Sequence, residues 1–154
     1  MPQEDRETTS TQALRLMLTY RDGTVVLDDV VPVVKRLPPS DPLPETSAER
    51  PLSGFWYELR DRNGEVLYRQ IEPNPIINAW IEPVDRDGRD SAGIRRIAAV
   101  PRMKAFTLLV PDRADGDHVL LVSSPLDEPG IARPAEPRWR IPLPDRQEGG
   151  DRDG

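Results

Sequence analysis

The chain has 154 residues, of which 18 are proline and none is cysteine, with 21 basic side chains against 27 acidic ones. This length suits a single domain, and the lack of cysteine excludes disulfides, thiolate catalysis and cysteine-ligated metal sites. A formal net charge of −6 argues against nucleic acid as the main partner. Apolar runs are too short for a membrane span, and the first residues lack the basic and apolar regions of a signal peptide, so we expect a cytoplasmic protein.

The first part of the chain alternates as half-buried strands do. In Gln12–Tyr20 the residues Leu14, Leu16, Leu18 and Tyr20 share one face, and this period of two is typical of a strand. Asp22-Gly23 predicts a hairpin turn. The valine-rich segments Thr24–Leu27 and Val30–Leu37, interrupted by Asp28-Asp29, follow as further strand.

Residues 38–52 are rich in proline and show no hydrophobic period. They predict a long, extended surface loop. At the start of this loop Arg36, Pro39 and Pro42 match the basic-x-x-Pro-x-x-Pro form of a polyproline ligand. This segment is either a ligand that a polyproline-recognising partner binds or a plain spacer loop.

Residues 53–72 carry a self-consistent hairpin pattern. If Asn63-Gly64 is a two-residue turn between the strands Ser53–Arg60 and Glu65–Glu72, opposite charges and apolar partners face each other. The predicted pairs are Arg62 with Glu65, Leu59 with Tyr68, Glu58 with Arg69 and Trp56 with Ile71.

The remaining strands are predicted at Ile76–Glu82, Ile94–Val100, Met103–Val110 and His118–Ser124. Residues 125–144 form an extended proline-rich segment that could dock as an edge strand, because Trp139, Ile141 and Leu143 share a parity. Residues 1–11 and 145–154 are expected to be disordered. Because no helical stripe is present, residues 12–124 predict an all-β domain, a two-sheet antiparallel β-sandwich of seven to nine strands.

Two predicted hairpins, SGFWYELR-DRNG-EVLYRQIE and MKAFTLLV-PDRADGD-HVLLVSS, resemble the immunoglobulin-like and fibronectin-type sandwiches that bacteria use as accessory modules. The resemblance covers about Gln12–Ser124 and implies a bacterial protein of that superfold. The chain departs from antibody domains in lacking the cysteine pair, and a likeness at this level transfers no function.

If each strand crosses the sandwich once, the loops divide into an aspartate-glycine end and a proline end. The first end would collect Arg21–Gly23, Asp61–Gly64, Asp85–Asp90 and Asp112–Asp117. Carboxylates are the ligands that calcium prefers, so a calcium site is an alternative to ordinary hairpin turns. Its candidate ligands are Asp85, Asp87, Asp90, Asp112, Asp115 and Asp117. No other cofactor is expected.

The sequence does not favour an enzyme. His118 is the only histidine; we expect it on the surface at the start of a strand, with the neighbouring Asp117 pointing to the other face. The glycine patterns of hydrolase elbows and nucleotide-binding loops do not occur. Glu58, Asp61 and Glu82 are the candidates for the paired carboxylates of glycoside hydrolysis, and nothing in the sequence marks them as buried.

The leading interpretation is a non-catalytic protein-interaction or scaffold module that acts through an exposed sheet edge, the proline-rich loop and the Trp139 tail. The alternative is a small-ligand or carbohydrate-binding module at the aspartate-glycine end, with or without calcium. Trp56, Trp80 and Trp139 are the candidate contact residues, and packing is the competing role for Trp56. A protein partner is expected, rather than nucleic acid or a membrane, and the sequence does not indicate an oligomeric state.

Overall fold

The computed structural model describes residues 12–43, 52–83, 94–126 and 133–145, and from residue 78 to 98 it describes only the backbone of two strands. Every regular element in these residues is a β-strand, which confirms the predicted all-β class. The strands are β1 (Gln12–Arg21), β2 (Thr24–Val34), β3 (Phe55–Arg60), β4 (Val66–Ile71), β5 (Asn78–Pro83), β6 (Ile94–Ala99), β7 (Met103–Pro111), β8 (His118–Ser123) and β9 (Glu136–Pro142).

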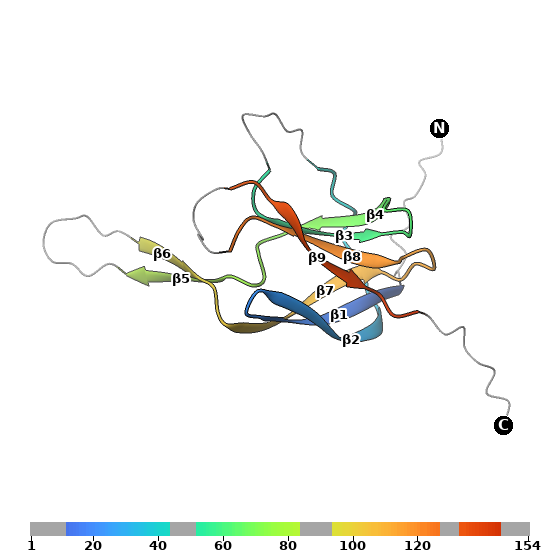
Figure 1. Cartoon of the computed structure of the whole chain (residues 1–154), viewed down its shortest axis with the longest axis horizontal. Helices are drawn as coiled ribbons and strands as arrows, with labels where there is room; N and C mark the ends of the chain where they lie inside the picture. Colours follow the sequence, from blue (N-terminus) through green and yellow to red (C-terminus); the bar gives the residue numbers. More distant parts are fainter. Residues whose placement is uncertain (1–11, 44–51, 84–93, 127–132, 146–154) are drawn as a thin grey trace, which may run out of the picture.

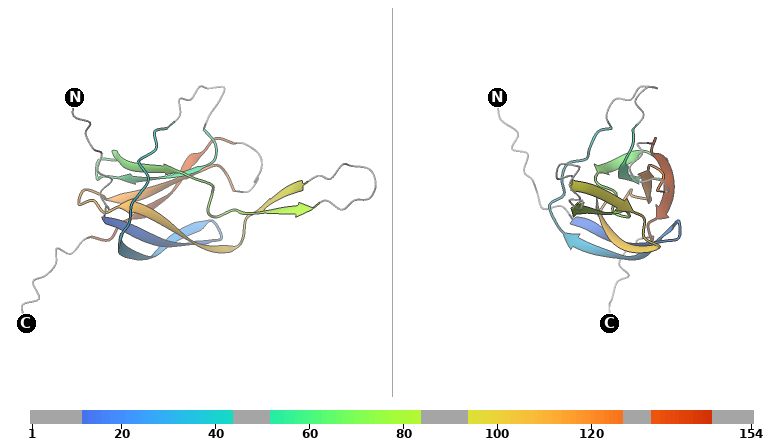
Figure 2. Two further views of the ribbon diagram at one scale, coloured as in Figure 1. Left: turned by 180° about the vertical axis from the view of Figure 1, so that it is seen from behind. Right: turned by 90° about the vertical axis from the view of Figure 1, so that its left-hand side faces the viewer.

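Seven of the strands form two antiparallel sheets that pack against each other as a sandwich (Figure 1). One sheet has the strand order β2-β1-β7, and the other has the order β4-β3-β8-β9. Strands β5 and β6 pair only with each other. Their hairpin projects from one end of the sandwich (Figure 2). The predicted antiparallel sandwich is thus confirmed.

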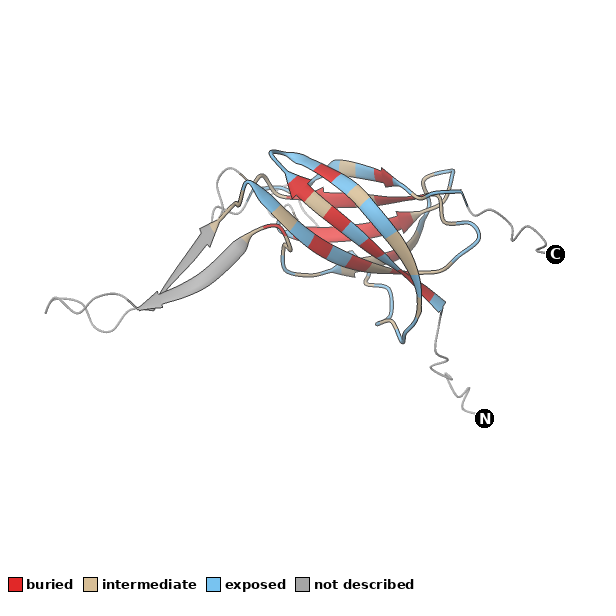
Figure 3. Cartoon of the chain, turned by 90° about the horizontal axis from the view of Figure 1, so that it is seen from below, coloured by how far each residue is buried: buried red, intermediate tan, exposed pale blue. Residues whose placement is uncertain are grey.

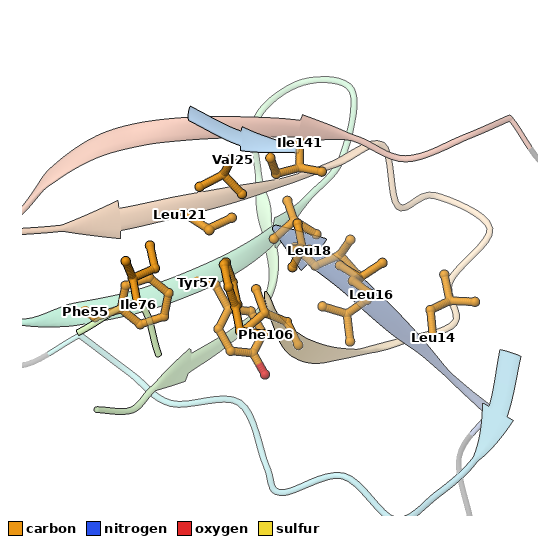
Figure 4. Packing of buried hydrophobic residues seen from close by; sticks show 14 of the residues in the cluster. Leu14, Leu16, Leu18, Val25, Phe55, Tyr57, Ile76, Phe106, Leu121 and Ile141 are labelled. Carbon is orange, nitrogen blue, oxygen red and sulfur yellow. The ribbon is translucent and has the colours of Figure 1, made fainter. Parts of the chain in front are cut away.

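The core lies between the two sheets and begins with the alternation of β1. From Leu14 onward every second residue of this strand is buried, namely Leu14, Leu16, Leu18 and Tyr20. The residues that lie between these four are exposed or half-buried, which gives the banding in Figure 3. The opposite sheet contributes to the same apolar cluster (Figure 4) through Phe55, Tyr57, Leu59, Val119 and Leu121. Burial of this apolar surface is the dominant favourable contribution to folding.

Strand β2 continues through the acidic pair that was expected to interrupt it. Its register with β1 shifts at Asp28, which is an extra residue in β2. A β-bulge of this kind bends a strand without ending it. Pro32 is tolerated farther along because β2 is an edge strand, so the missing N–H breaks no ladder on its outer side.

The β3–β4 hairpin has the predicted register over most of its length. Leu59 and Tyr68, which both face the core, lie opposite each other. The same register places the other predicted partners together, Glu58 with Arg69 and Trp56 with Ile71.

The predicted two-residue turn at Asn63-Gly64, and with it the Arg62–Glu65 pair, is wrong. Asp61 donates its backbone N–H to Glu65 O (3.0 Å), so three residues form the loop between them. Leu67 is then an extra residue in β4, and this bulge restores the predicted register beyond it. The cause is the Asp61 carboxylate, which accepts the backbone N–H groups of Asn63 (2.8 Å) and Glu65 (2.9 Å) and so favours the longer turn.

The start of the proline-rich connection, residues 35–43, lies along β4, and we call this segment the strap. Asp41 donates its backbone N–H to Arg69 O (2.8 Å). In return the Ser40 hydroxyl and the Asp41 carboxylate accept the backbone N–H groups of Arg69 (2.9 Å) and Ile71 (2.9 Å). The strap thereby shields the hydrogen-bonding edge of β4, with side-chain oxygens as the acceptors of two β4 N–H groups.

Two tyrosine hydroxyls close the side of the sandwich where β4 and β7 lie. Tyr57 of β3 donates to the backbone O of Leu109 in β7 (2.8 Å). Tyr68 of β4 donates to the backbone O of Pro38 in the strap (2.9 Å). Each hydroxyl therefore joins a residue of the core to backbone outside its own sheet, which satisfies a buried polar group and fixes the spacing of the elements.

Strand β9 closes the opposite side, where it contacts β2. It is the segment that was expected to dock as an edge strand, and it pairs antiparallel with β8. Trp139 packs edge-on against Tyr20, with ring centroids 6.2 Å apart, and its Nε1–H donates to Gly23 O (3.0 Å). The aromatic contact and the hydrogen bond tie β9 to the β1–β2 hairpin of the other sheet.

The strap also decides which loops share an end of the sandwich. The predicted loop positions assumed that only the strands cross the length of the sandwich. The strap also runs back along the molecule after β2, and this additional crossing changes the end at which the loops lie. The β1–β2 turn consequently lies beside Pro101-Arg102, as the hydrogen bond from Asp22 N–H to Arg102 O shows (3.0 Å), and its predicted place at the aspartate-glycine end is wrong. The turns around Asp61 and Asp115 do lie together, whereas Asp85–Asp90 falls outside the described residues.

We predict that removing the strap's side-chain acceptors loosens the edge of β4. In Ser40→Ala/Asp41→Ala the N–H groups of Arg69 and Ile71 lose their protein partners, and we expect the free energy of unfolding to fall by about 1–2 kcal/mol. Urea unfolding measures the loss, and amide hydrogen exchange should become faster at those two positions. Ser53→Ala, an exposed serine outside the strap, is the control; equal exchange in all variants would contradict the strap contact.

We predict an alkaline loss of stability that depends on the two tyrosines. Burial, and then nearby carboxylates, raise the pKa of Tyr57 and raise the pKa of Tyr68 to about 12. A raised folded-state pKa contributes stability that is complete below the unfolded value of about 10 and is lost as the pH rises through the folded value. Urea unfolding between about pH 9 and pH 12 should therefore show a smaller decline for Tyr68→Phe than for the wild type; identical slopes would contradict this.

Candidate functional site

An open cleft of about 910 Å³ lies at the end of the sandwich where the β3–β4 and β7–β8 turns meet. Its lining is partly apolar, with Leu14 and Val30 from one sheet and Leu59 from the other. The charged residues described in its lining are Asp61, Arg62, Asp112, Arg113, Asp115, Asp117 and Asp145. Carboxylates thus outnumber guanidinium groups by five to two, which gives the cleft a negative electrostatic potential.

Backbone contacts bring the turns and the end of β9 together. Asp117 donates its N–H to Arg60 O (2.9 Å), which ties the β7–β8 loop to the end of β3. Leu143 donates its N–H to Asp117 O (3.0 Å), which holds the chain after β9 against the same loop. Gly116 lies so near Leu59 that a Cβ would stand 3.2 Å from the Leu59 Cδ1. A glycine at this position lets the loop approach the apolar part of the cleft closely.

The carboxylates of Asp115 and Asp117 in the cleft lie beside cationic partners. Arg113 donates from Nε and Nη2 to the two oxygens of Asp115 (2.8 and 2.7 Å), and this pairing lowers the pKa of the Asp115 carboxyl. The Asp117 Oδ2 atom lies 2.8 Å from His118 Nδ1 and 3.4 Å from Arg140 Nη2. Pairs as exposed as Arg113 with Asp115 contribute little to stability, so an incoming cation can compete for the carboxylate at small cost.

The candidate calcium ligands divide into two groups. Asp85, Asp87 and Asp90 lie outside the described residues. Asp112, Asp115 and Asp117 share the cleft, but Asp115 is paired with an arginine and Asp117 with His118. Within the described part of the chain, no three His, Cys, Asp or Glu side chains are grouped as a metal ion requires. Calcium at this end stays a prediction.

His118 begins β8, as expected, but it is buried (7% exposed) rather than on the surface. It also meets Asp117, against expectation, because Asp117 precedes the strand and the alternation of strand side chains does not apply to it. The described residues of the adjoining cleft include no serine, threonine, cysteine, lysine or tyrosine. The pair therefore has no nucleophile to activate among them.

The outer face of the four-stranded sheet carries a buried ion cluster. Glu58 is 2% exposed. Its Oε1 accepts a hydrogen bond from Arg60 Nη2 (2.6 Å), and its Oε2 accepts one from Arg69 Nε (2.8 Å). The two guanidinium groups replace the water that the carboxylate loses on burial. Cross-strand pairing indicated the Arg69 contact, whereas the burial of Glu58 and the contact with Arg60 were missed.

The three tryptophans proposed as contact residues differ in their burial and in what the structure describes of them. Trp56 is 7% exposed, so its ring packs within the protein, and its Nε1–H has no hydrogen-bond partner among the described residues. Trp139 is half-buried against Tyr20. Trp80 lies in β5, of which the structure describes only the backbone. Trp56 and Trp139 thus pack against other parts of this chain, and contact with a ligand or partner stays a prediction for the three tryptophans.

The polyproline-ligand residues Arg36, Pro39 and Pro42 are exposed on the strap. The strap's backbone is engaged with β4, and Pro39 O accepts a hydrogen bond from the Gln70 side chain (2.9 Å). A partner that reads these prolines would have to bind the outer side of a segment that is already held in place.

The chain after β9 reaches the cleft, which was not predicted from the sequence. The signal was the shared parity of Trp139, Ile141 and Leu143, which places Leu143 on the inward side of β9. That parity predicted docking of the segment, but the position of Leu143 beside Asp117 depends on how the sheets stack.

No protein-family model matches the chain, and comparisons with curated proteins and with solved structures give no significant match. The likeness to immunoglobulin-like sandwiches accordingly stays a prediction. Within the described residues, no helix has the length and apolar composition that crossing a bilayer requires.

We predict that Glu58→Gln destabilises the domain by about 2 kcal/mol, because it leaves two partly buried guanidinium groups without their counter-charge. Chemical unfolding at neutral pH measures the effect. Glu65→Gln, which removes the same charge from an exposed turn position, should change the free energy of unfolding by less than about 0.5 kcal/mol. Equal effects of the two substitutions would show that the cluster contributes nothing specific.

Proposed function

We propose that this chain is a non-catalytic interaction module that holds a positively charged segment of a partner protein in the cleft. The observation that supports this is the combination of an apolar lining with an excess of carboxylates. Lysine and arginine side chains match that combination, because their aliphatic stems pack on apolar surface while their heads pair with carboxylates.

The lining favours a polypeptide over a sugar. None of the described residues in the cleft is aromatic, whereas flat ligands and sugars are commonly held by exposed rings. The volume is within the range of ligand sites, and the open form of the cleft admits a side chain that stays attached to a chain. The described lining holds no serine, threonine, cysteine or lysine, the nucleophiles that an adjacent base activates.

Long-range electrostatics support the same proposal. The whole chain carries a formal net charge of −6, so a cationic partner is attracted before contact and the cleft focuses that attraction. The same charge is unfavourable for nucleic acid. The proposal includes a cytoplasmic setting and an immunoglobulin-like relationship. In immunoglobulin-like variable domains, loops at one end of the sandwich form the binding surface, and the cleft proposed here also lies between turns at one end.

We expect a fluorescently labelled arginine-rich peptide to bind the full chain with an affinity that falls as salt is added, because salt screens the attraction. Asp115→Asn/Asp145→Asn should weaken binding by about fivefold, the effect of losing roughly 1 kcal/mol of exposed charge pairing. Fluorescence anisotropy measures both results.

The matched control is Asp22→Asn/Glu136→Gln, which removes two charges from the opposite end of the sandwich. Asparagine also suits the left-handed backbone of residue 22, where φ is +46°. A glutamate-rich peptide of equal length serves as the second probe. Equal weakening in both double variants, or equal affinity for both peptides, would refute the cleft as a site for cationic segments.

A further inference from the structure

The sandwich has four sheet edges, and the structure protects three of them. The edge of β4 is covered by the strap, through Ser40 and Asp41. Strands β2 and β9 contact each other on the opposite side, where Trp139 is bonded to the β1–β2 turn. The outer edge of β7, in contrast, pairs with no strand among the described residues. An unpaired edge is a template for another strand.

Two hydrogen bonds show which backbone groups of β7 point outward. Asp112 donates its N–H to Gln12 O (2.9 Å), and Asp22 donates its N–H to Arg102 O (3.0 Å). Residues 102 and 112 therefore bond toward β1. Because backbone groups alternate along a strand, the N–H and C=O groups of the even residues of β7 point toward β1, and those of the odd residues point away from it. The bond from the Tyr57 hydroxyl to Leu109 O agrees with this, because it reaches Leu109 from outside the sheet. The N–H and C=O groups of Ala105, Thr107 and Leu109 thus face away from β1.

The sequence of β7 does not discourage pairing. Its nine residues, MKAFTLLVP, contain a single charge, that of Lys104, and their only proline is the last residue. Ala105 and Thr107 are exposed, and Met103 is 56% exposed. Natural edge strands are usually blunted by several charges, an internal proline or a covering segment. At β4 the strap is such a covering segment, whereas β7 has a single charge and no internal proline.

We propose that a second copy of this chain pairs antiparallel along β7, with the two-fold axis at Thr107. In this register Thr107 faces Thr107 of the second copy, and Ala105 faces Leu109 of the second copy. All of these residues direct their backbone groups outward, so each pairing exchanges N–H···O bonds. Leu109 O accepts the Tyr57 hydroxyl with one lone pair and would accept the N–H of Ala105 of the second copy with the other. The two three-stranded sheets then become one continuous sheet.

Self-complementarity is the reason for choosing a second copy as the occupant. The register places Lys104 opposite Val110 of the second copy, so no like charges meet across the interface. A two-fold axis requires that one patch match itself, and a neutral strand centred on a threonine meets that condition. The proposal does not depend on the acidic cleft, which lies at the end of the sandwich rather than along this edge.

Sedimentation velocity of the full chain over a wide concentration range tests the proposal. We expect a monomer–dimer equilibrium that added salt strengthens, because salt screens the repulsion between two acidic chains. Thr107→Lys places two like charges opposite each other at the axis and should raise the dimer dissociation constant by about tenfold. Thr107→Val keeps a neutral β-branched pair and should leave the constant unchanged.

Val26→Lys is the matched charge control, because Val26 is exposed in β2 of the same sheet but far from β7 in the strand order. It should leave the dimer intact. The chain has no cysteine of its own, so Thr107→Cys should form a disulfide-linked dimer under mild oxidation, whereas Val26→Cys should not.

A wild type that stays monomeric at every concentration would overturn the proposal and leave the β7 edge to an extended strand of a different protein. A dimer that Thr107→Lys does not weaken, or that Thr107→Cys does not cross-link, would place the contact elsewhere and would also overturn it.

Discussion

Strand β3 is buried on both faces, and this double burial constrains most of what surrounds it. Its inward residues Tyr57 and Leu59 belong to the core, while Trp56 and Glu58 on the other face are buried as well. A sandwich strand ordinarily keeps one polar, solvated face. Because Glu58 does not, its carboxylate must be neutralised by arginines within the protein.

The same strand connects the core to the cleft and to the other sheet. Leu59 contributes to the apolar lining of the cleft, and Gly116 is packed against it. Tyr57 crosses to β7 with its hydroxyl. A change in the register of β3 would therefore alter the core, the cleft and the tyrosine contact together, because a shift of one residue turns every side chain to the opposite face.

The strap, residues 35–43, shows how a proline-rich loop can organise a fold. By running along β4 it shields one sheet edge, and by crossing the molecule it sets which turns share an end. The carboxylates of the β3–β4 and β7–β8 turns meet on the cleft as a result, while the β1–β2 turn lies at the far end. The protein surface thus has distinct regions: an acidic cleft, a shielded edge and an open edge.

Local patterns predicted much of the fold correctly. The strand positions and the pairing of Glu58 with Arg69 followed from alternation and from cross-strand complementarity. The turn at Asp61 did not follow, because a side-chain acceptor competed with the intrinsic preference of Asn63-Gly64. Of the site, only the convergence of the two aspartate-rich turns was predicted; the contribution of Leu143 and the burial of His118 were not.

The sequence by itself determined that the chain is all-β, where its strands lie and which residues of β1 face inward, because those properties arise between residues close along the chain. Only the tertiary structure decided the docking of the strap, the burial of the second face of β3 and the gathering of carboxylates around an apolar cleft. Each of these depends on contacts between segments far apart in the sequence. Such contacts are set by how the two sheets stack and by which edge each connection covers.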